Sequence, residues 1–382
     1  NRYGVTRILV SVIAAALVLS SCRNAGNNQA SGSGVDNPVA GRLTIEKEKN
    51  YFRVTVSEPW QNSPGIQHVW YLIPRDSAVP SDIRETQTIR IPVRRMICMS
   101  TTHIAMMRAL GADSLIAGIS GSSLIYDSVV LEGLRRGTIR DVGYEGSLNK
   151  ELVISLEPDL LMAYGVADPS TGNTSRLSET GVKVFYNADY LEEHPLSRCE
   201  WIRLFGLLTG REQRADSIFI RVSGAYRELA DKVRNGITSR PDVLLGAPWE
   251  DVWYVSPSDS YIGRLIEDAG GHYIYSDMTG PNSVPFSVES VFRRAAEAEL
   301  WINPGAAENL AGIAAADPRL ASLPLFSEGK VWNNRRRVTE EGGNDYWESA
   351  VVRPDLLLSD LVSIIHPELM PGYVQFYYRK LE

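Results

Sequence analysis

From residue 94 onward, short apolar segments alternate with amphipathic ones, and this alternation restricts the possible folds more than any other feature of the chain. The apolar segments have the length and composition of buried strands and comprise residues 95–99, 115–119, 160–163 and 182–186. The helical patterns between them lie at residues 104–110, 149–156 and 176–180. Alternating strands and helices predict a parallel sheet covered by helices.

A long helical pattern at residues 196–235 divides this alternation into two halves. Its apolar side chains repeat at helical spacing in Trp201, Leu204, Phe205 and Leu208 and continue after Gly210. Beyond it, strands are predicted at 243–245, 300–302 and 331–332, and helices at 261–269, 288–298 and 354–365. We therefore expect an α/β protein with two lobes of mainly parallel sheet, joined by a single long rigid helix and enclosing a cleft.

The chain before residue 94 has a different character. Strand-like runs at 51–56 and 69–74, bounded by Pro and Gly, predict a small β-rich extension. A stretch rich in Asn, Gly, Ser and Ala before it predicts a flexible tether. The predicted segments are a signal sequence at 1–22, the tether at 23–41, the extension at 42–92, a first α/β lobe at 93–195, a linking helical region at 196–238, and a second α/β lobe with a tail at 239–382.

The N-terminal segment has the pattern of a signal sequence. Arg2 and Arg7 precede an apolar run at residues 8–19, which ends in Leu19-Ser20-Ser21-Cys22. The run is about twelve residues long, short of the roughly twenty that span a bilayer as a helix. The tetrad resembles the lipobox of bacterial lipoproteins, which implies a lipid on Cys22 and a place in the cell envelope, on a membrane facing the periplasm. Cleavage near Cys22 without a lipid is the alternative.

Charge and cysteine content exclude some classes of function. The net charge is −7, and the basic residues are scattered apart from Arg335–Arg337, so nucleic acid is not expected as a partner. After the leader no other long apolar run follows, so we expect a soluble body. Cys98 and Cys199 have no diagnostic spacing, and both a disulfide and two buried free thiols stay open.

Several short motifs occur in a fixed order between residues 94 and 370. They are Met96–Leu110 with Gly111–Gly118, Asp141–Gly143 with Ser147–Glu151, Leu156–Leu160, Leu265–Gly271, Phe286–Glu289, and Asp317–Arg319 with Gly329–Trp332. In this order they resemble the iron-chelate, haem and cobalamin binding proteins of ABC importers. The resemblance implies a monomer that carries its ligand to a permease dimer with its ATPase, and that has no catalytic activity and no cofactor of its own.

The resemblance also implies a docking position on each lobe. In this family one glutamate per lobe meets arginines of the permease, and the matching residues here are Glu151 and Glu289. Exposed charges on both rims would position the protein on a basic partner and speed their encounter. The alternative for each glutamate is a favourable interaction with the dipole of its own helix.

Ligand contacts are expected on loops that follow strands, where open α/β sheets place their ligands. The first-lobe candidates are Thr101, Thr102, His103, Tyr126, Tyr144 and Tyr164. The second-lobe candidates are Trp249, Trp253, Tyr254, Tyr261, Arg335, Arg336, Arg337, Asn344 and Trp347. Aromatic rings suit a corrin, porphyrin or catecholate, and arginines suit an anionic chelate. For each aromatic residue a place in the core is the alternative, although Tyr164 and Tyr254 match family positions where an aromatic side chain faces the ligand.

Direct metal binding and catalysis have weaker support. His103 has two interpretations, an axial ligand to haem iron and a structural histidine. The other histidines are far apart, so no zinc or manganese site is predicted. Gly118–Ser122 resembles a hydrolase nucleophile elbow but has a serine where that motif needs its second glycine. A hydrolase is therefore kept only as the alternative from another class of function.

The predicted cargo depends on charge. We favour a ferric siderophore or haem over cobalamin, because the tyrosines and Arg335–Arg337 suit an anionic iron complex. Residues 42–92 and 373–381 lie outside the family pattern. Two roles are open for them, capping of the cleft and contact with another envelope protein.

Overall fold

The computed structural model describes residues 39–165 and 173–382. The predicted signal sequence, nearly all of the tether and the predicted lipid site at Cys22 lie outside these residues. Within them, no helix combines the length and the apolar character needed to cross a membrane.

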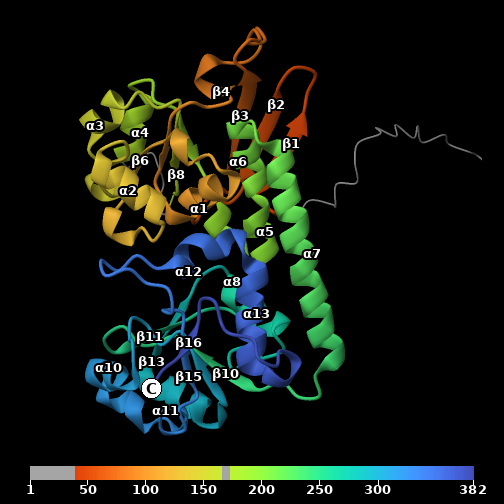
Figure 1. The fold of residues 1–382 in the computed structure, drawn as a ribbon, viewed down its shortest axis with the longest axis vertical. Helices are drawn as coiled ribbons and strands as arrows, with labels where there is room; N and C mark the ends of the chain where they lie inside the picture. Colours follow the sequence, from red (N-terminus) through yellow and green to blue (C-terminus); the bar gives the residue numbers. More distant parts are fainter. Residues whose placement is uncertain (1–38, 166–172) are drawn as a thin grey trace, which may run out of the picture. The chain divides into compact units, whose positions relative to one another are not determined.

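The predicted β-rich extension is a four-stranded sheet in the order β1-β2-β3-β4. Its strands are β1 (Leu43–Lys47), β2 (Phe52–Ser57), β3 (Gln67–Pro74) and β4 (Thr88–Ile91), of which only β3 and β4 run parallel. One face packs on the first lobe, where Trp70 stacks on Phe185 with ring centroids 5.9 Å apart. Figure 1 shows this sheet beside the first lobe. Val54 and Leu72 are fully buried in the core that the two share. The extension is therefore joined to the first lobe by a continuous core.

The first lobe has a five-stranded parallel sheet in the order β7-β6-β5-β8-β9. Its strands are β5 (Met96–Cys98), β6 (Ile116–Ile119), β7 (Arg140–Asp141), β8 (Leu160–Ala163) and β9 (Val184–Tyr186). Its helices are α1 (Thr101–Leu110), α2 (Ser128–Arg136), α3 (Lys150–Ser155) and α4 (Asn173–Ser178). Helix α1 begins at the Ser100 cap and ends at Gly111, whose φ of 69° is left-handed.

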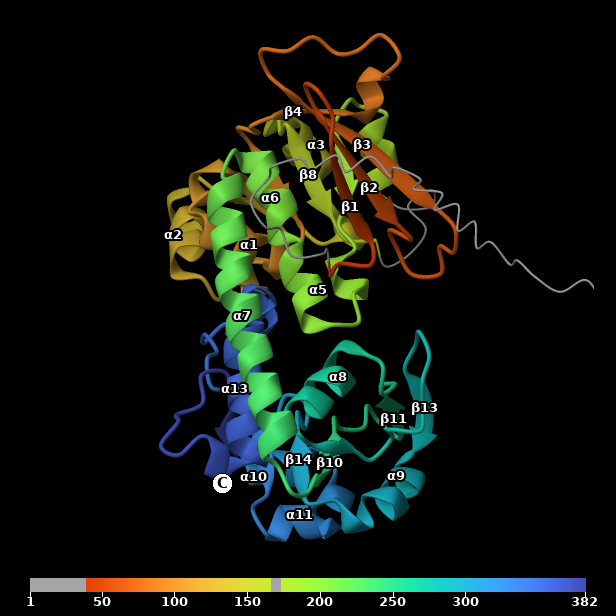
Figure 2. The ribbon, with the colours of Figure 1, turned by 90° about the vertical axis from the view of Figure 1, so that its right-hand side faces the viewer.

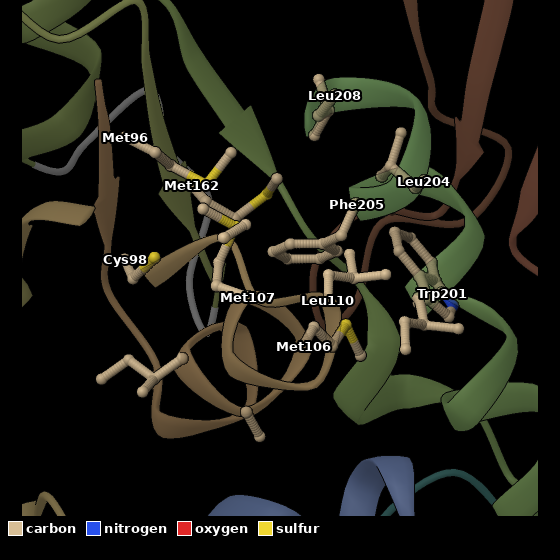
Figure 3. Close-up of a cluster of buried hydrophobic side chains, with 14 of the residues drawn as sticks. Met96, Cys98, Met106, Met107, Leu110, Met162, Trp201, Leu204, Phe205 and Leu208 are labelled. Carbon is tan, nitrogen blue, oxygen red and sulfur yellow. The ribbon is translucent and has the colours of Figure 1, made fainter. Parts of the chain in front are cut away.

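Sulfur-containing and aromatic side chains fill the core between this sheet and the helices. Figure 3 shows Phe205 pointing toward Met107 of α1 and Met162 of β8, and all three are fully buried. Cys98 lies in this core and Cys199 is also fully buried; both are free thiols. Of the two alternatives left open by the sequence, the structure therefore shows buried thiols.

The linking region is helical, and its long helical pattern is divided among three helices. These are α5 (Pro195–Glu200), α6 (Ile202–Thr209) and α7 (Glu212–Gly236). Gly210 ends α6 with a φ of 67°, and α7 starts again after Arg211. Of these three helices, α7, with 25 residues, runs from one lobe to the other (Figure 2). Phe219 belongs to the core of the first lobe and Tyr226 to that of the second.

The second lobe has a five-stranded sheet in the order β12-β10-β14-β15-β16. Its strands are β10 (Asp242–Leu245), β12 (His272–Tyr273), β14 (Leu300–Ile302), β15 (Val331–Asn333) and β16 (Arg379–Lys380), with β16 antiparallel to β15. A two-stranded antiparallel ribbon of β11 (Val252–Val255) and β13 (Val284–Ser287) lies beside it. The helices are α8 (Tyr261–Asp268), α9 (Val288–Arg294), α10 (Leu310–Ala316), α11 (Pro324–Ser327), α12 (Asp345–Glu348) and α13 (Pro354–Ile365).

The C-terminal tail is part of the second lobe. The Asp360 carboxylate in α13 accepts hydrogen bonds from the backbone N–H groups of Phe376, Tyr377 and Tyr378. Tyr377 and Tyr378 are fully buried. The tail thus completes the core and sheet of this lobe.

A short segment around α12 returns to the first lobe. Val351 and Val352, just after α12, belong to the first-lobe core, although the sequence order places them in the second lobe. The Thr101 hydroxyl donates to the Trp347 carbonyl at 2.8 Å. Gly343 approaches so closely that a Cβ there would lie 2.0 Å from the Ile125 carbonyl oxygen. The two lobes are therefore connected by α7 and by this segment.

Candidate ligand-binding cleft

A cavity of about 750 Å³ lies between the extension, the first lobe and the second lobe. From the N-terminal side it is lined by Arg42, Glu58, Trp60–Pro64 and Tyr190–Glu193. The second lobe contributes Leu245, Gly246, Tyr254, Ser256, Pro257, Asp259–Ile262, Gly280–Ser283, Asn303, Tyr346 and Trp347. We refer to this cavity as the front cleft. Its volume suits a ligand of the size of a small-molecule chelate.

Aromatic side chains from both lobes line the front cleft. Trp347 has 62% of its surface exposed, and its ring meets the edge of Tyr346 at a centroid distance of 4.7 Å. Tyr254 is 56% exposed because successive residues of β11 point to opposite faces. Tyr190 donates its hydroxyl hydrogen bond to the Gly165 carbonyl, and burial raises the pKa of this phenol to about 12. These rings offer flat apolar surface with neutral hydroxyl groups.

The charged residues of the front cleft are mostly paired within the protein. Arg42 forms an ion pair with Glu58 at 2.9 Å. Glu192 accepts hydrogen bonds from the Gly41 and Arg42 N–H groups, and Asp259 accepts one from the Gly280 N–H. Arg42 is the single basic residue in this lining. Glu193 is a further acidic residue of the lining, and the other polar side chains are amides and hydroxyls, so the cleft is not built for a strongly anionic ligand.

A second group of aromatic residues lies together in the first lobe. Burial raises the pKa of Tyr164, and the negative charges of Glu145 and Tyr144 raise it further. The Tyr144 ring packs on Gly121, where a Cβ would lie 2.5 Å from the ring. Neither Tyr144 nor Tyr164 is part of the lining of the front cleft.

Residues 96–334 match the family described as periplasmic binding protein. This match covers well over half of the chain and includes both lobes and the helix that joins them. The chain belongs to the periplasmic binding protein family. Membership of this family implies a location outside the cytoplasmic membrane.

Two relatives illustrate the range of this similarity. An uncharacterized lipoprotein of Methanocaldococcus jannaschii is 27% identical over 320 residues, which are 80% of this chain and 74% of the relative. A cobalamin-binding protein of Halobacterium salinarum is 26% identical over 200 residues, which are 52% of this chain and 50% of the relative.

Solved structures show the same fold. A periplasmic heme-binding protein from Pseudomonas aeruginosa has a TM-score of 0.57 at 18% identity, covering 76% of this chain and 98% of that one. A heme-binding protein from Roseiflexus has a TM-score of 0.54 at 20% identity, covering 72% and 99%. The predicted α/β fold, with two lobes and one long helix between them, is confirmed.

The structure of this binding protein brings three of the predicted ligand residues together in the front cleft, namely Tyr254, Tyr261 and Trp347. Tyr261 lies beneath the Arg198 guanidinium, 4.7 Å from its ring centroid. Burial raises the Tyr261 pKa, so its phenol stays neutral.

Two other predicted residues line a different hollow. Tyr126 and Arg337 belong to a groove of about 1130 Å³ beside α7, which we call the rear groove. Arg337 pairs with Asp345 at 2.6 Å, and its guanidinium lies over the Tyr126 and Phe376 rings. Neither residue lines the front cleft.

The other arginines of the predicted run are also separate from the front cleft. Arg335 pairs with Glu308 at 3.5 Å, and Arg336 is exposed. Neither lines the front cleft, so contact of Arg335–Arg337 with a ligand stays a prediction that this cavity does not support.

Two aromatic predictions are corrected by burial. His103 has no exposed surface, its ring lies 5.9 Å from that of Phe205, and burial lowers its pKa to about 3. Of its two interpretations, the structure supports the structural histidine. Trp253 is 1% exposed and donates its indole N–H to the Leu245 carbonyl inside the second lobe. Neither side chain offers a surface that a ligand in the cleft would reach.

The remaining predicted residues have structural places outside the cleft lining. Thr101 and Thr102 lie at the start of α1, where Thr102 is 3.0 Å from the capping Ser100 hydroxyl. Asn344 is buried and caps α12 through the Tyr346 N–H. Trp249 is 73% exposed but is not part of the lining.

The glutamates expected to meet a permease are both exposed. Glu151 lies in the first turn of α3, and Glu289 in the first turn of α9. Glu289 is 3.5 Å from Arg319, which also pairs with Asp251 and Asp317. Their placement is compatible with both interpretations, permease docking and helix-dipole stabilisation, so docking stays a prediction.

Sequence reasoning missed the part of the cleft that comes from the extension. The residues Asn62-Ser63-Pro64-Gly65 form a turn signal between two strand-like runs, so the hairpin itself was predictable. Its position beside the cleft depends on packing between segments about one hundred residues apart, which no local pattern encodes. Among the described residues there is no group of three or more His, Cys, Asp or Glu that would hold a metal ion.

Proposed function

We propose that this protein captures a metal chelate outside the cytoplasmic membrane and delivers it to the permease of an ABC importer. The observation that carries this proposal is the front cleft, which lies between two lobes joined by α7. Its lining combines aromatic rings, neutral amides and hydroxyls with charged residues that are mostly paired within the protein. The partner's ATPase would supply the energy, so this chain needs no catalytic residues. Its role is to bind, to present and to release.

The charge of the lining supports a cargo with an uncharged, hydrogen-bonding edge. The preference for an anionic iron complex depended on Arg335–Arg337, and those arginines lie outside the front cleft. A corrinoid such as cobalamin has a flat ring surrounded by amide groups, which match the rings and amides of this lining. The similarity to the cobalamin-binding protein of Halobacterium salinarum supports the same choice.

An iron chelate is the second candidate. The phenols of Tyr254 and Tyr261 line the front cleft and can donate hydrogen bonds to the oxygen atoms of a ferric chelate. A chelate without free carboxylates would suit this lining better than haem, whose propionates need basic partners.

Delivery would require a docking surface and a position near the membrane. We propose that Glu151 and Glu289 meet basic residues of the permease, since both are exposed and lie on different lobes. We further propose that a lipid on Cys22 holds the protein at the membrane. The lipoprotein name of the Methanocaldococcus jannaschii relative supports this anchor.

The proposed function is tested by titrating the protein from residue 24 onward with cyanocobalamin, ferrichrome and haemin, using calorimetry and tryptophan fluorescence. We expect saturable, sub-micromolar binding of cyanocobalamin. Replacing Trp347→Ala should weaken binding by tenfold or more, because an exposed ring in the cleft is lost. Trp249→Ala is the matched control, because this exposed ring lies outside the lining and its loss should change affinity little. Binding of none of the three probes would contradict the proposal.

A further inference from the structure

One wall of the front cleft comes from outside the region that matches the family. The loop between β2 and β3 contributes Trp60–Pro64 to the lining, whereas the family match begins at residue 96. We call residues 58–66 the extension hairpin. Its exposed residues share a cavity with second-lobe residues such as Ser256, Asn282 and Ser283.

The extension hairpin is held at the end of the first-lobe sheet. Trp60 forms a parallel backbone bridge with Gly165, just after β8. A Cβ at residue 165 would lie 2.8 Å from the Trp60 Cβ, so the close approach needs glycine there. The Trp60 ring also meets the edges of His68 and Tyr186 at centroid distances of 5.0 and 5.8 Å. Ligands of open α/β sheets bind at this end of the strands.

Hydrogen bonds fix both sides of the hairpin. The Arg42 guanidinium donates to the Leu191 carbonyl at 3.2 Å and to the Glu58 carbonyl at 3.2 Å. The Ser63 hydroxyl donates to the Trp60 carbonyl at 2.5 Å, and the Glu58 N–H donates to the Ile66 carbonyl at 2.8 Å. A loop with these bonds is a pre-formed surface, so a ligand would not have to order it on binding.

Two side chains at the tip of the hairpin remain available. Gln61 and Asn62 are exposed and line the front cleft, and neither side chain is hydrogen-bonded to another residue of the described chain. Asn62 has a φ of 58°, a conformation that asparagine tolerates better than most residues. Each amide can both donate and accept a hydrogen bond.

We propose that Gln61 and Asn62 are specificity-determining residues that hydrogen-bond the polar edge of the bound chelate. This proposal rests on the proposed function of the front cleft and adds a third wall to it. Because the tip of the hairpin is held by hydrogen bonds and its two exposed side chains are neutral amides, it selects a ligand edge made of amides or other neutral polar groups. An edge bearing carboxylates would meet Glu58 and Glu192 without a free basic partner.

The test compares the double variant Gln61→Ala/Asn62→Gly with wild type. Glycine is used at residue 62 because it removes the side chain without straining a positive φ. The matched control is Gln67→Ala, an exposed amide of the same sheet that does not line the front cleft. Each protein is titrated by calorimetry with the tightest of the three probes, and its thermal unfolding is recorded to detect any loss of structure.

We expect the double variant to bind on the order of tenfold more weakly, with unchanged thermal unfolding, since two hydrogen bonds to the ligand are lost. Gln67→Ala should bind like wild type. If cyanocobalamin is the ligand, wild type should prefer it over its derivative with one peripheral amide replaced by a carboxylate. The double variant should show a smaller preference.

Two other results would count against the proposal. Equal affinity and equal preference in the double variant and in wild type would overturn the role of Gln61 and Asn62 and leave the front cleft as the binding site. Failure of wild type to bind any probe would instead overturn the proposed function, and this inference with it.

Discussion

At the scale of single residues, Glu348 is a buried acid that connects the two lobes. Its carboxylate accepts hydrogen bonds from the Tyr126 N–H at 2.8 Å and the Asp127 N–H at 3.0 Å, both in the first lobe. Burial raises its pKa to about 8. The negative charges of Asp127 and Asp345 also raise the pKa, whereas the two N–H donors lower it. Asp127 is itself paired with Arg108, and Asp345 with Arg337.

This pKa predicts how stability depends on pH. In the unfolded chain a glutamate titrates near about 4.3, so between that pH and about 8 the folded state holds a proton that the unfolded state has released. Stability contributed by Glu348 is therefore complete below the unfolded pKa and is lost as the pH rises toward 8, with a slope of at most about 1.4 kcal/mol per pH unit. Glu348→Gln should lack this component. In urea unfolding at pH 5, 6.5 and 8, the free energy of unfolding of the variant should rise relative to that of wild type as the pH rises. If the two free energies changed with pH in parallel, the raised pKa of Glu348 would be refuted.

At the scale of elements, α7 contains an interior glycine that lowers the stability of the helix. Gly224 lies in the interior of this helix, is exposed, and has no atom within 4 Å of a Cβ placed on it. Gly224→Ala should stabilise the protein by about 0.5–1 kcal/mol, because alanine loses less backbone freedom on folding. The contrasting variant is Gly206→Ala in α6, because a Cβ there would lie 2.6 Å from that of Ala215. This variant should lower the stability of the protein by about 1–3 kcal/mol. Denaturant unfolding of both measures the difference, and a loss of stability in Gly224→Ala would be inconsistent with this view of α7.

The sequence pattern predicted the strands and helices whose apolar faces are long or repeated. The strands at 96–98 and 160–163, with α13, lie where periodicity placed them. The break between α6 and α7 was not predicted, because the apolar spacing continues across Gly210. The ribbon of β11 and β13 was also missed, since its strands are far apart in the sequence and pair only through tertiary contacts.

The candidate site was predictable only in part, for a related reason. Alternation in β11 places Tyr254 and Trp253 on opposite faces, but it does not say which of the two faces is covered. Tyr126 and Arg337 follow strands, as ligand residues often do, yet their loops run to the rear groove beside α7. Local patterns place residues on loops, whereas the side of the sheet that a loop reaches depends on long-range packing.

At the scale of the whole molecule, the two connections between lobes predict a small closing motion. Helix α7 contributes side chains to both cores. Val351 and Val352, which follow α12 of the second lobe, pack into the core of the first lobe. Opening the lobes widely would expose these side chains, which is costly. Small-angle scattering with and without saturating ligand should therefore show little change in the radius of gyration. A large compaction on binding would contradict the proposed rigid link.

The returning segment also has a consequence for the order in which the chain folds during synthesis. The Thr101 hydroxyl and the Trp347 carbonyl that it contacts are separated by 246 residues. At roughly 5–20 residues per second, a ribosome needs about 12–50 s to cover that distance. For this time the nascent first lobe lacks Val351 and Val352, and the apolar surface that they later cover stays open to chaperones or to other chains. The first lobe is thus completed late, and its folding rate should be limited by closure of a very long loop.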